Sequence, residues 1–232
     1  MNTATLTKTE YTCNHCARAF KREPSLATHV CESKRRYLER DEVGVTIALQ
    51  AYLRFYEITQ GTAKNKTFKD FSASPYYRAF VKFGRYCQEI RAVNVSQFVT
   101  WVVKKNKKID HWCHESVYYE YLMEYLRTES VGDALARSIE SSIDWQEKTG
   151  NAAHDYLRYG NANALCYAIS TGRVSAWAVY NCDSGHELLA RLNSEQLTMI
   201  WPMVETDTWS QRLRDRPEDR DYARAILKQA GW

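Results

Sequence analysis

The chain has 232 residues, of which 44% are hydrophobic and 26% are charged, with only 9 Gly and 4 Pro. These figures exclude collagen-like, low-complexity and disulfide-scaffold proteins, and they allow one sizeable core with a small appendage. No run of 18 apolar residues occurs, so we expect no membrane-spanning segment and no membrane partner. The polar N-terminus has no apolar signal region, which predicts a cytoplasmic protein. In that setting seven cysteines indicate reduced thiols or metal ligands rather than disulfides.

The net charge of +4 hides a strong partition along the chain. Residues 1–40 carry +4, residues 64–108 carry eleven Lys or Arg against two Asp or Glu, and residues 109–232 carry −7. Such asymmetry indicates a polyanionic partner. The alternative is that the charges only solvate helix faces.

The most specific chemical pattern begins at Cys13 and Cys16, whose spacing lets a tight turn bring two thiolates onto one metal ion. Around them runs the pattern Tyr11-x-Cys13-x₂-Cys16-x₃-Phe20-x₅-Leu26-x₂-His29, which resembles the C2H2 zinc-finger family position by position. The resemblance covers about 20 of the 232 residues. It implies a small ββα-like module in which Zn²⁺ is bound by both cysteines and by His29. Zinc can supply ~10–16 kcal/mol to a module too small to fold on its own burial.

The fourth ligand departs from the family, because no His or Cys lies three to five residues after His29. Cys31 is the nearest soft ligand, yet on a continuous helix it would point about 200° away from His29. We therefore predict a Cys13, Cys16, His29, Cys31 site in which the helix ends or unwinds at His29. Glu32 or water are the alternatives, and thiolate suits a structural zinc site better than carboxylate.

In the zinc-finger family, residues between the Phe and the His face the DNA major groove. On this chain the resemblance places Lys21, Arg22, Glu23, Ser25 and Thr28 in those positions. A single finger seldom specifies a DNA site alone, and lone fingers also bind proteins.

Beyond the module, a basic connector at 34–36 leads into a chain that reads as almost entirely helical. Helix signals predict helices over about 41–60, from Ser74-Pro75 onward, from a Ser96 cap, around 118–126, and from Ser130 to about 148 with a stop at Gly150. Shorter helices are expected around 152–159, 161–170, 184–193 and 217–229, a Lys-rich loop over 62–73, and one strand over 173–182. The prediction is a mostly α protein with a multi-helix globular body over 37–232 and a zinc module with its connector over 1–36.

Residues 64–108 interleave basic side chains with aromatic ones, as single-stranded nucleic-acid grooves do. Aromatic residues at helical spacing more often belong to the hydrophobic core. Clustered Lys and Arg side chains, however, repel one another and lower stability, which favours a binding partner of opposite charge. We predict that the partner is a nucleic acid, with DNA favoured over RNA. The alternative is an acidic protein surface, which includes the acidic half of the same chain. The predicted phosphate-binding residues are Arg18, Lys21, Arg22, Lys34, Arg35, Arg36, Arg78, Lys82, Arg85, Lys104, Lys105, Lys107 and Lys108.

Catalytic patterns are weak. His111, Cys113, His114 and Glu115 form the only other cluster of reactive side chains, and the acidic run 215–221 reads as a solvated turn. No phosphate-binding loop, dinucleotide fingerprint, HExxH or GxSxG occurs. The expectation is that the chain is not an enzyme, with a metal-dependent nuclease as the remaining enzymatic alternative.

The closing segments 173–193 and 221–232 are similar to uncharacterised products of large T4-like tailed phages. That resemblance implies a viral protein acting in the bacterial host cytoplasm or in the virion, and it transfers no functional residues. The sequence thus predicts a non-catalytic nucleic-acid-binding accessory protein in replication, repair or transcription. The alternative is a structural or adaptor protein that uses the same surfaces to bind another protein. The oligomeric state does not follow from the sequence.

Overall fold

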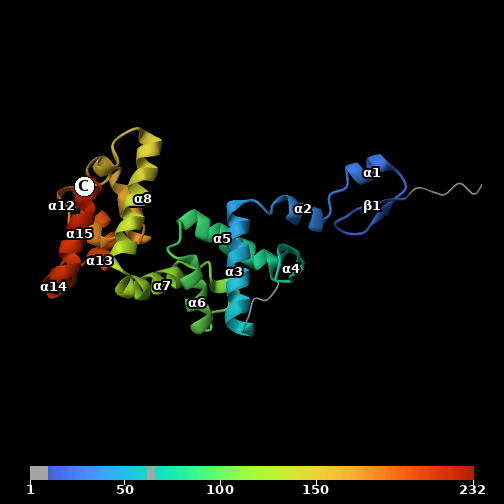
Figure 1. The fold of residues 1–232 in the computed structure, drawn as a ribbon, viewed down its shortest axis with the longest axis horizontal. Coiled ribbons are helices and arrows are strands. Elements are labelled where there is room, and N and C mark those ends of the chain that lie inside the picture. The colour runs from blue at the N-terminus through green and yellow to red at the C-terminus, as the bar shows by residue number, and fades with distance from the viewer. Residues whose placement is uncertain (1–9, 62–65) are drawn as a thin grey trace, which may run out of the picture. The chain divides into compact units, whose positions relative to one another are not determined.

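The computed structural model of the chain describes residues 10–61 and 66–232 (Figure 1). Part of the predicted Lys-rich loop, residues 62–65, lies outside the described residues. Residues 1–9, where we predicted that no signal segment is present, also lie outside them. The described chain is mostly helical with one two-stranded hairpin near its start, which confirms the predicted fold class. No helix in the described parts is both long and apolar enough to cross a membrane.

The chain forms two compact units, one ending at Gln88 and one beginning at Glu89. The predicted division into 1–36 and 37–232 stays a prediction about domains. The elements of the first unit are β1 (Tyr11–Thr12), β2 (Ala19–Phe20), α1 (Glu23–Ala27), α2 (Glu32–Leu38), α3 (Val43–Gln60), α4 (Phe68–Ala73) and most of α5 (Tyr77–Ile90).

The core of the first unit is aromatic. Tyr52 of α3 contacts Phe71 of α4 and Phe80 of α5, with ring centroids 5.2 and 5.5 Å apart, and all three side chains are buried. Helices α3 and α5 cross at very close range, because a Cβ on Gly84 would lie 2.1 Å from the carbonyl oxygen of Gly44. Only glycine permits this backbone approach.

The second unit is a helical assembly built around buried aliphatic side chains, among them Leu122, Leu135, Leu165 and Leu188. Its elements are α6 (Val95–Lys104), η1 (Ile109–His111), α7 (Glu115–Thr128), α8 (Val131–Thr149), η2 (Ala153–Asp155), α9 (Tyr156–Tyr159), α10 (Ala162–Ser170), α11 (Ala176–Val179), α12 (Asp183–Arg191), α13 (Ser194–Val204), α14 (Thr206–Asp215) and α15 (Pro217–Gln229).

Several predicted helix ends are confirmed. Ser130 caps α8 by accepting the backbone N–H of Asp133, and Gly150 ends that helix in the left-handed conformation with a φ of 75°. Two predicted caps are displaced by two residues or fewer: Glu42 rather than Asp41 precedes α3, and Asn94 rather than Ser96 caps α6. The four shorter helices predicted beyond residue 150 are present as α9 with η2, α10, α12 and α15.

The strand predicted over 173–182 is wrong, because this segment contains the buried helical turn α11. Ser175 caps the turn by accepting the backbone N–H of Trp177, and the amide side chain of Asn181 donates back to the carbonyl of Trp177. Apolar, β-branched runs mark burial as much as strand, so a short buried helix carries the same pattern.

The loop prediction over 62–73 is also wrong in its second half, which forms α4. The signal is a capping box: the side chain of Thr67 caps the third helical residue, and the carboxylate of Asp70 accepts the backbone N–H of Thr67 at 2.7 Å. Helices α2, α13 and α14 were not predicted at all.

Candidate metal centre

The hairpin presents the first two candidate ligands. Strands β1 and β2 pair antiparallel, with Tyr11 opposite Phe20 and Thr12 opposite Ala19. The turn between them is closed by the backbone N–H of Cys13, which donates to the carbonyl of Arg18 at 2.9 Å. This turn holds the buried thiol of Cys13 and the exposed thiol of Cys16 on one side of the hairpin.

The other two candidates follow the short helix α1, which has Pro24 in its first turn and ends at Ala27. His29 and Val30 lie outside any helix, and Cys31 is the N-cap of the next helix, α2. The chain therefore changes direction between the two ligands. This is the helix end that the spacing of His29 and Cys31 required if both were to reach one ion.

Four ligand atoms converge as a result. One atom from each of Cys13, Cys16, His29 and Cys31 lies within 4.8 Å of all the others. Cys16 Sγ is 3.3 Å from His29 Nε2, and Cys13 Sγ is 4.0 Å from Cys31 Sγ. The group is thus suited to binding a metal ion, and it is the one such His, Cys, Asp and Glu group found in residues 10–61 and 66–232.

Two of the candidate sulfur ligands accept backbone hydrogen bonds, whereas the pKa of the Cys16 thiol is raised, with burial and the neighbouring Cys31 and Cys13 thiols among the causes. The backbone N–H of His15 donates to Cys13 Sγ at 3.4 Å and, as the main cause, lowers the pKa of that thiol. The backbone N–H of Lys34 donates to Cys31 Sγ, also at 3.4 Å. Hydrogen bonds of this kind to metal-binding sulfur stabilise its negative charge.

Glu32, the alternative fourth ligand, is engaged elsewhere. Its carboxylate accepts hydrogen bonds from Arg35 at 2.6 Å and from Arg36 at 3.1 Å, and these two bonds lower the pKa of Glu32. The exposed guanidinium of Arg78, from α5, lies 3.6 Å from the same carboxylate. We call Glu32, Arg35, Arg36 and Arg78 the Glu32 cluster.

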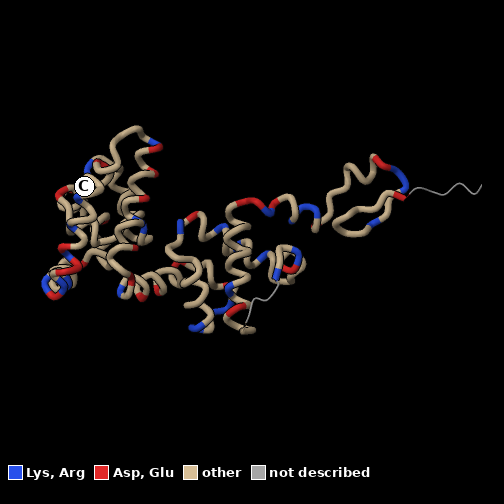
Figure 2. Tube along the Cα trace, in the orientation of Figure 1, with Lys and Arg blue, Asp and Glu red and all other residues tan. Residues whose placement is uncertain are grey.

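The Glu32 cluster joins two segments that the sequence predicted separately as phosphate-binding, the connector and the basic face of α5. Its three arginines face the carboxylate of Glu32, and Arg35 also pairs with Glu39 at 4.0 Å; Arg78 is 80% exposed. Arg36 is held more firmly, because its guanidinium also donates to the carbonyl of Ser72 and lies 4.3 Å from the ring centre of Tyr77. Lys and Arg positions are marked in blue along the trace in Figure 2.

Other predicted phosphate-binding residues are divided between exposed and paired ones. Lys105 and Lys107 of the second unit form 2.8 Å ion pairs with Glu124 and Glu120 on α7, and Arg85 pairs with Glu42 at 2.9 Å. Lys34 donates to the carbonyl of His29 at 3.1 Å, and Arg18 lies over the ring of Phe20. The remaining predicted cations are exposed: Lys21, Arg22, Lys82, Lys104 and Lys108.

The second reactive cluster forms no metal group. The imidazoles of His111 and His114 stack with centroids 5.0 Å apart, but no third ligand joins them within the described residues. In the acidic run, Asp219 pairs with Arg216 and Asp221 with Arg220. The turn predicted over 215–221 is a junction of two helices, because only Arg216 lies outside α14 and α15.

Comparison with known proteins gives no relative. No protein-family model matches the chain, and no curated protein and no solved structure matches it either.

Proposed function

We propose that the chain binds one Zn²⁺ ion through Cys13, Cys16, His29 and Cys31, in a module of the zinc-finger type. Three thiolates and one imidazole match the ligand sets of closed structural zinc sites, which are tetrahedral and leave no open position for catalysis. We further propose that this module and the cations beside it bind nucleic-acid phosphates, DNA in preference to RNA, in a non-catalytic accessory role.

The Glu32 cluster is the observation that supports phosphate binding most directly. It follows the last metal ligand in the chain, so an ion bound at Cys31 would fix the start of the helix that carries Arg35 and Arg36. With Glu39 included, which pairs with Arg35 at 4.0 Å, the three arginines exceed the two carboxylates by one charge, and Arg35 and Arg78 are exposed to solvent. Guanidinium groups bind phosphate oxygens in bidentate fashion, so the excess charge suits a nucleic-acid backbone.

The module carries further exposed cations. Lys21 and Arg22 lie between β2 and α1, in the positions that face the major groove in zinc fingers. If six phosphates are neutralised, the logarithm of the binding constant should fall linearly with the logarithm of salt concentration, with a slope of about −5.

The test is fluorescence anisotropy of labelled duplex DNA, single-stranded DNA and RNA with the zinc-loaded protein across a salt series. We expect saturable binding at low salt. The slope of the logarithm of the binding constant against the logarithm of salt concentration should become shallower by about one unit for each lost phosphate contact, as in Arg78→Gln. Arg224→Gln, which removes an exposed arginine from α15, is the matched control. Absence of binding at low salt would remove the nucleic-acid proposal.

An acidic protein surface is the second candidate partner. Lys105 and Lys107 form ion pairs with carboxylates of α7, and this supports an acidic protein surface as a partner of the basic segment. Binding of polyglutamate with no binding of nucleic acid would favour an acidic protein as the partner.

A metal-dependent nuclease is the enzymatic alternative. We expect DNA to remain intact after long incubation with the protein and Mg²⁺, and cleavage would instead support a nuclease.

A further inference from the structure

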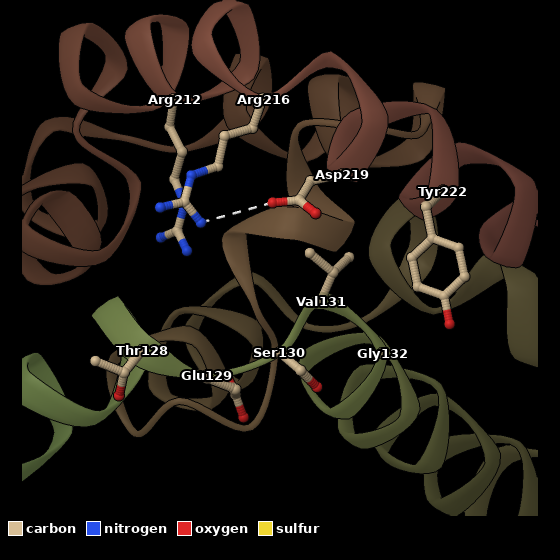
Figure 3. Close-up of a pocket in the computed structure, with 9 residues that line it drawn as sticks. All are labelled: Thr128, Glu129, Ser130, Val131, Gly132, Arg212, Arg216, Asp219 and Tyr222. Atoms are coloured by element: carbon tan, nitrogen blue, oxygen red, sulfur yellow. Dashed lines mark ion pairs between the residues drawn. The ribbon is translucent and has the colours of Figure 1, made fainter.

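A pocket of about 450 Å³ lies within the second unit, apart from the metal group and the basic residues considered so far. Figure 3 shows it between the start of α8 and the junction of α14 with α15. Two arginines from that junction, Arg212 and Arg216, extend into it with their guanidinium groups side by side (Figure 3).

The two arginines are not equally neutralised. Arg216 has a carboxylate partner, Asp219, at 3.6 Å. Arg212 has no ion pair and no hydrogen bond among the described residues; its guanidinium lies 5.0 and 4.9 Å from the ring centres of Trp177 and Trp209. Burial, with the charge of Arg216 as the next cause, lowers the pKa of Arg212, so its position costs free energy that an anion would offset.

The other carboxylate on the pocket wall is already engaged. Glu129, whose side chain is 2% exposed, is bound by two nitrogen atoms of Arg137 from outside the pocket. Arg212 is therefore the one arginine at this pocket that has no carboxylate partner among the described residues.

The opposite wall adds donors. Val131 and Gly132 are the first residues of the 19-residue helix α8, whose first backbone N–H groups have no partner within the helix. A Cβ on Gly132 would meet the hydroxyl of Tyr222 at 3.4 Å, so a side chain at this position would narrow the pocket. Tyr222 adds a hydroxyl group to the pocket wall, whereas the hydroxyl of Ser130 donates to the carboxylate of Asp133 at 2.7 Å and accepts the backbone N–H of Asp133.

We propose that this pocket binds a phosphate-class oxyanion, held by Arg212 and Arg216 on one side and by the first turn of α8 on the other. The guanidinium of Arg212, which has no carboxylate partner, the backbone N–H groups of Val131 and Gly132 and the volume of the pocket all fit a phosphate group or a small phosphomonoester. Asp219 competes with the anion for Arg216, so we expect affinity in the millimolar range.

The test is a titration of the zinc-loaded full chain with inorganic phosphate at constant ionic strength, followed by calorimetry and by the fluorescence of Trp177 and Trp209. Arg212→Gln should weaken binding at least about tenfold, as loss of charge-assisted hydrogen bonds does. Arg214→Gln, an exposed arginine on the same helix, should leave it unchanged. Asp219→Asn should tighten binding by removing the competing carboxylate.

Gly132→Ala changes the pocket without weakening helix α8. Alanine has a higher helix propensity than glycine, and its methyl group would enter the pocket. We expect it to weaken phosphate binding without lowering the melting temperature. A 5′-phosphorylated oligonucleotide that competes with phosphate, while the 5′-hydroxyl form does not, would identify a nucleic-acid end as the source of the phosphate. Competition by a small phosphomonoester alone would identify a metabolite. The proposal is overturned if phosphate does not saturate any site, or if Arg212→Gln binds it as tightly as the unaltered chain.

Discussion

The sulfur of Cys31 accepts the backbone N–H of Lys34 at 3.4 Å, so the residue that completes the metal group also caps helix α2. A side-chain acceptor at this position satisfies one of the unpaired donors of a helix start. The metal site and the helix carrying Arg35 and Arg36 are thereby joined at one residue.

Replacement of Cys31 by serine separates the two roles. Serine is a good helix cap but a poor zinc ligand, so Cys31→Ser should keep α2 while weakening zinc binding by at least about a hundredfold, more than loss of an outer hydrogen-bond partner causes. Competition with a chromophoric chelator measures the affinity. Glu32→Ala should bind zinc normally, and undiminished affinity in Cys31→Ser would show that Cys31 is not the fourth ligand.

Thiol reactivity gives an independent count of the ligands. None of the seven cysteines, all of which lie in the described residues, forms a disulfide. Cys87, Cys166 and Cys182 are buried, and burial raises the pKa of Cys166 and Cys182. Reactivity follows the exposed thiolate, so these three should stay slow to react in the native chain.

Addition of a zinc chelator should expose three further thiols to an alkylating reagent, namely Cys13, Cys16 and Cys31. Mass spectrometry of the labelled peptides assigns them, with the denatured chain as the reference for complete labelling. Equal labelling of these three residues with and without zinc would contradict the proposed site.

Some features of this structure could be predicted from the sequence and others could not. The Cys13 and Cys16 spacing identified half of the metal group, and the geometric conflict between His29 and Cys31 correctly required the helix to end before Cys31. Local signals also placed α8, because Ser130 and Gly150 act within one turn of the helix ends.

The Glu32 cluster could not be predicted, because Arg78 is 46 residues away from Glu32 and reaches it only through the packing of the unit. The strand expected over 173–182 failed for a related reason: its apolar residues are buried by tertiary contacts, and burial hides the difference between strand and helix. The α4 capping box was a local signal that could have been found, since Thr67 and Asp70 have the required spacing.

The contact of α3 with α5 predicts a severe effect from a small substitution. In Gly84→Ala the new methyl carbon would lie 2.1 Å from a backbone oxygen and 2.6 Å from the backbone nitrogen of Ala48. The helices must separate, at a cost of about 1–3 kcal/mol or more in the free energy of unfolding. Urea unfolding measures it, and Gly132→Ala serves as the control in an open position. A stability equal to that of the unaltered chain would mean that the two helices do not pack so closely.

The Lys105 and Glu124 pair predicts a pH effect. The hydrogen bond from Lys105, followed by that from Trp101, lowers the pKa of Glu124. A carboxyl group with a lower pKa in the folded state contributes stability above its unfolded value of about 4.3, and that contribution is lost as the pH falls through the folded value. Glu124→Gln should therefore lower the melting temperature slightly, by about 1–2 °C near neutral pH, since exposed pairs contribute little.

The difference between Glu124→Gln and the unaltered chain should vanish in acid, below the folded pKa. Glu140→Gln, an exposed residue on α8, should show no such pH-dependent difference. A difference that persists unchanged into acid would mean that the ion pair is not its cause.

Zinc K-edge X-ray absorption of the purified, zinc-loaded chain tests the metal centre most directly, because it reports the number and type of ligand atoms. We expect one zinc ion with three sulfur neighbours at about 2.3 Å and one nitrogen neighbour at about 2.0 Å. Two sulfur neighbours with added oxygen, or a purified chain that retains no zinc, would show that the four residues do not form this centre.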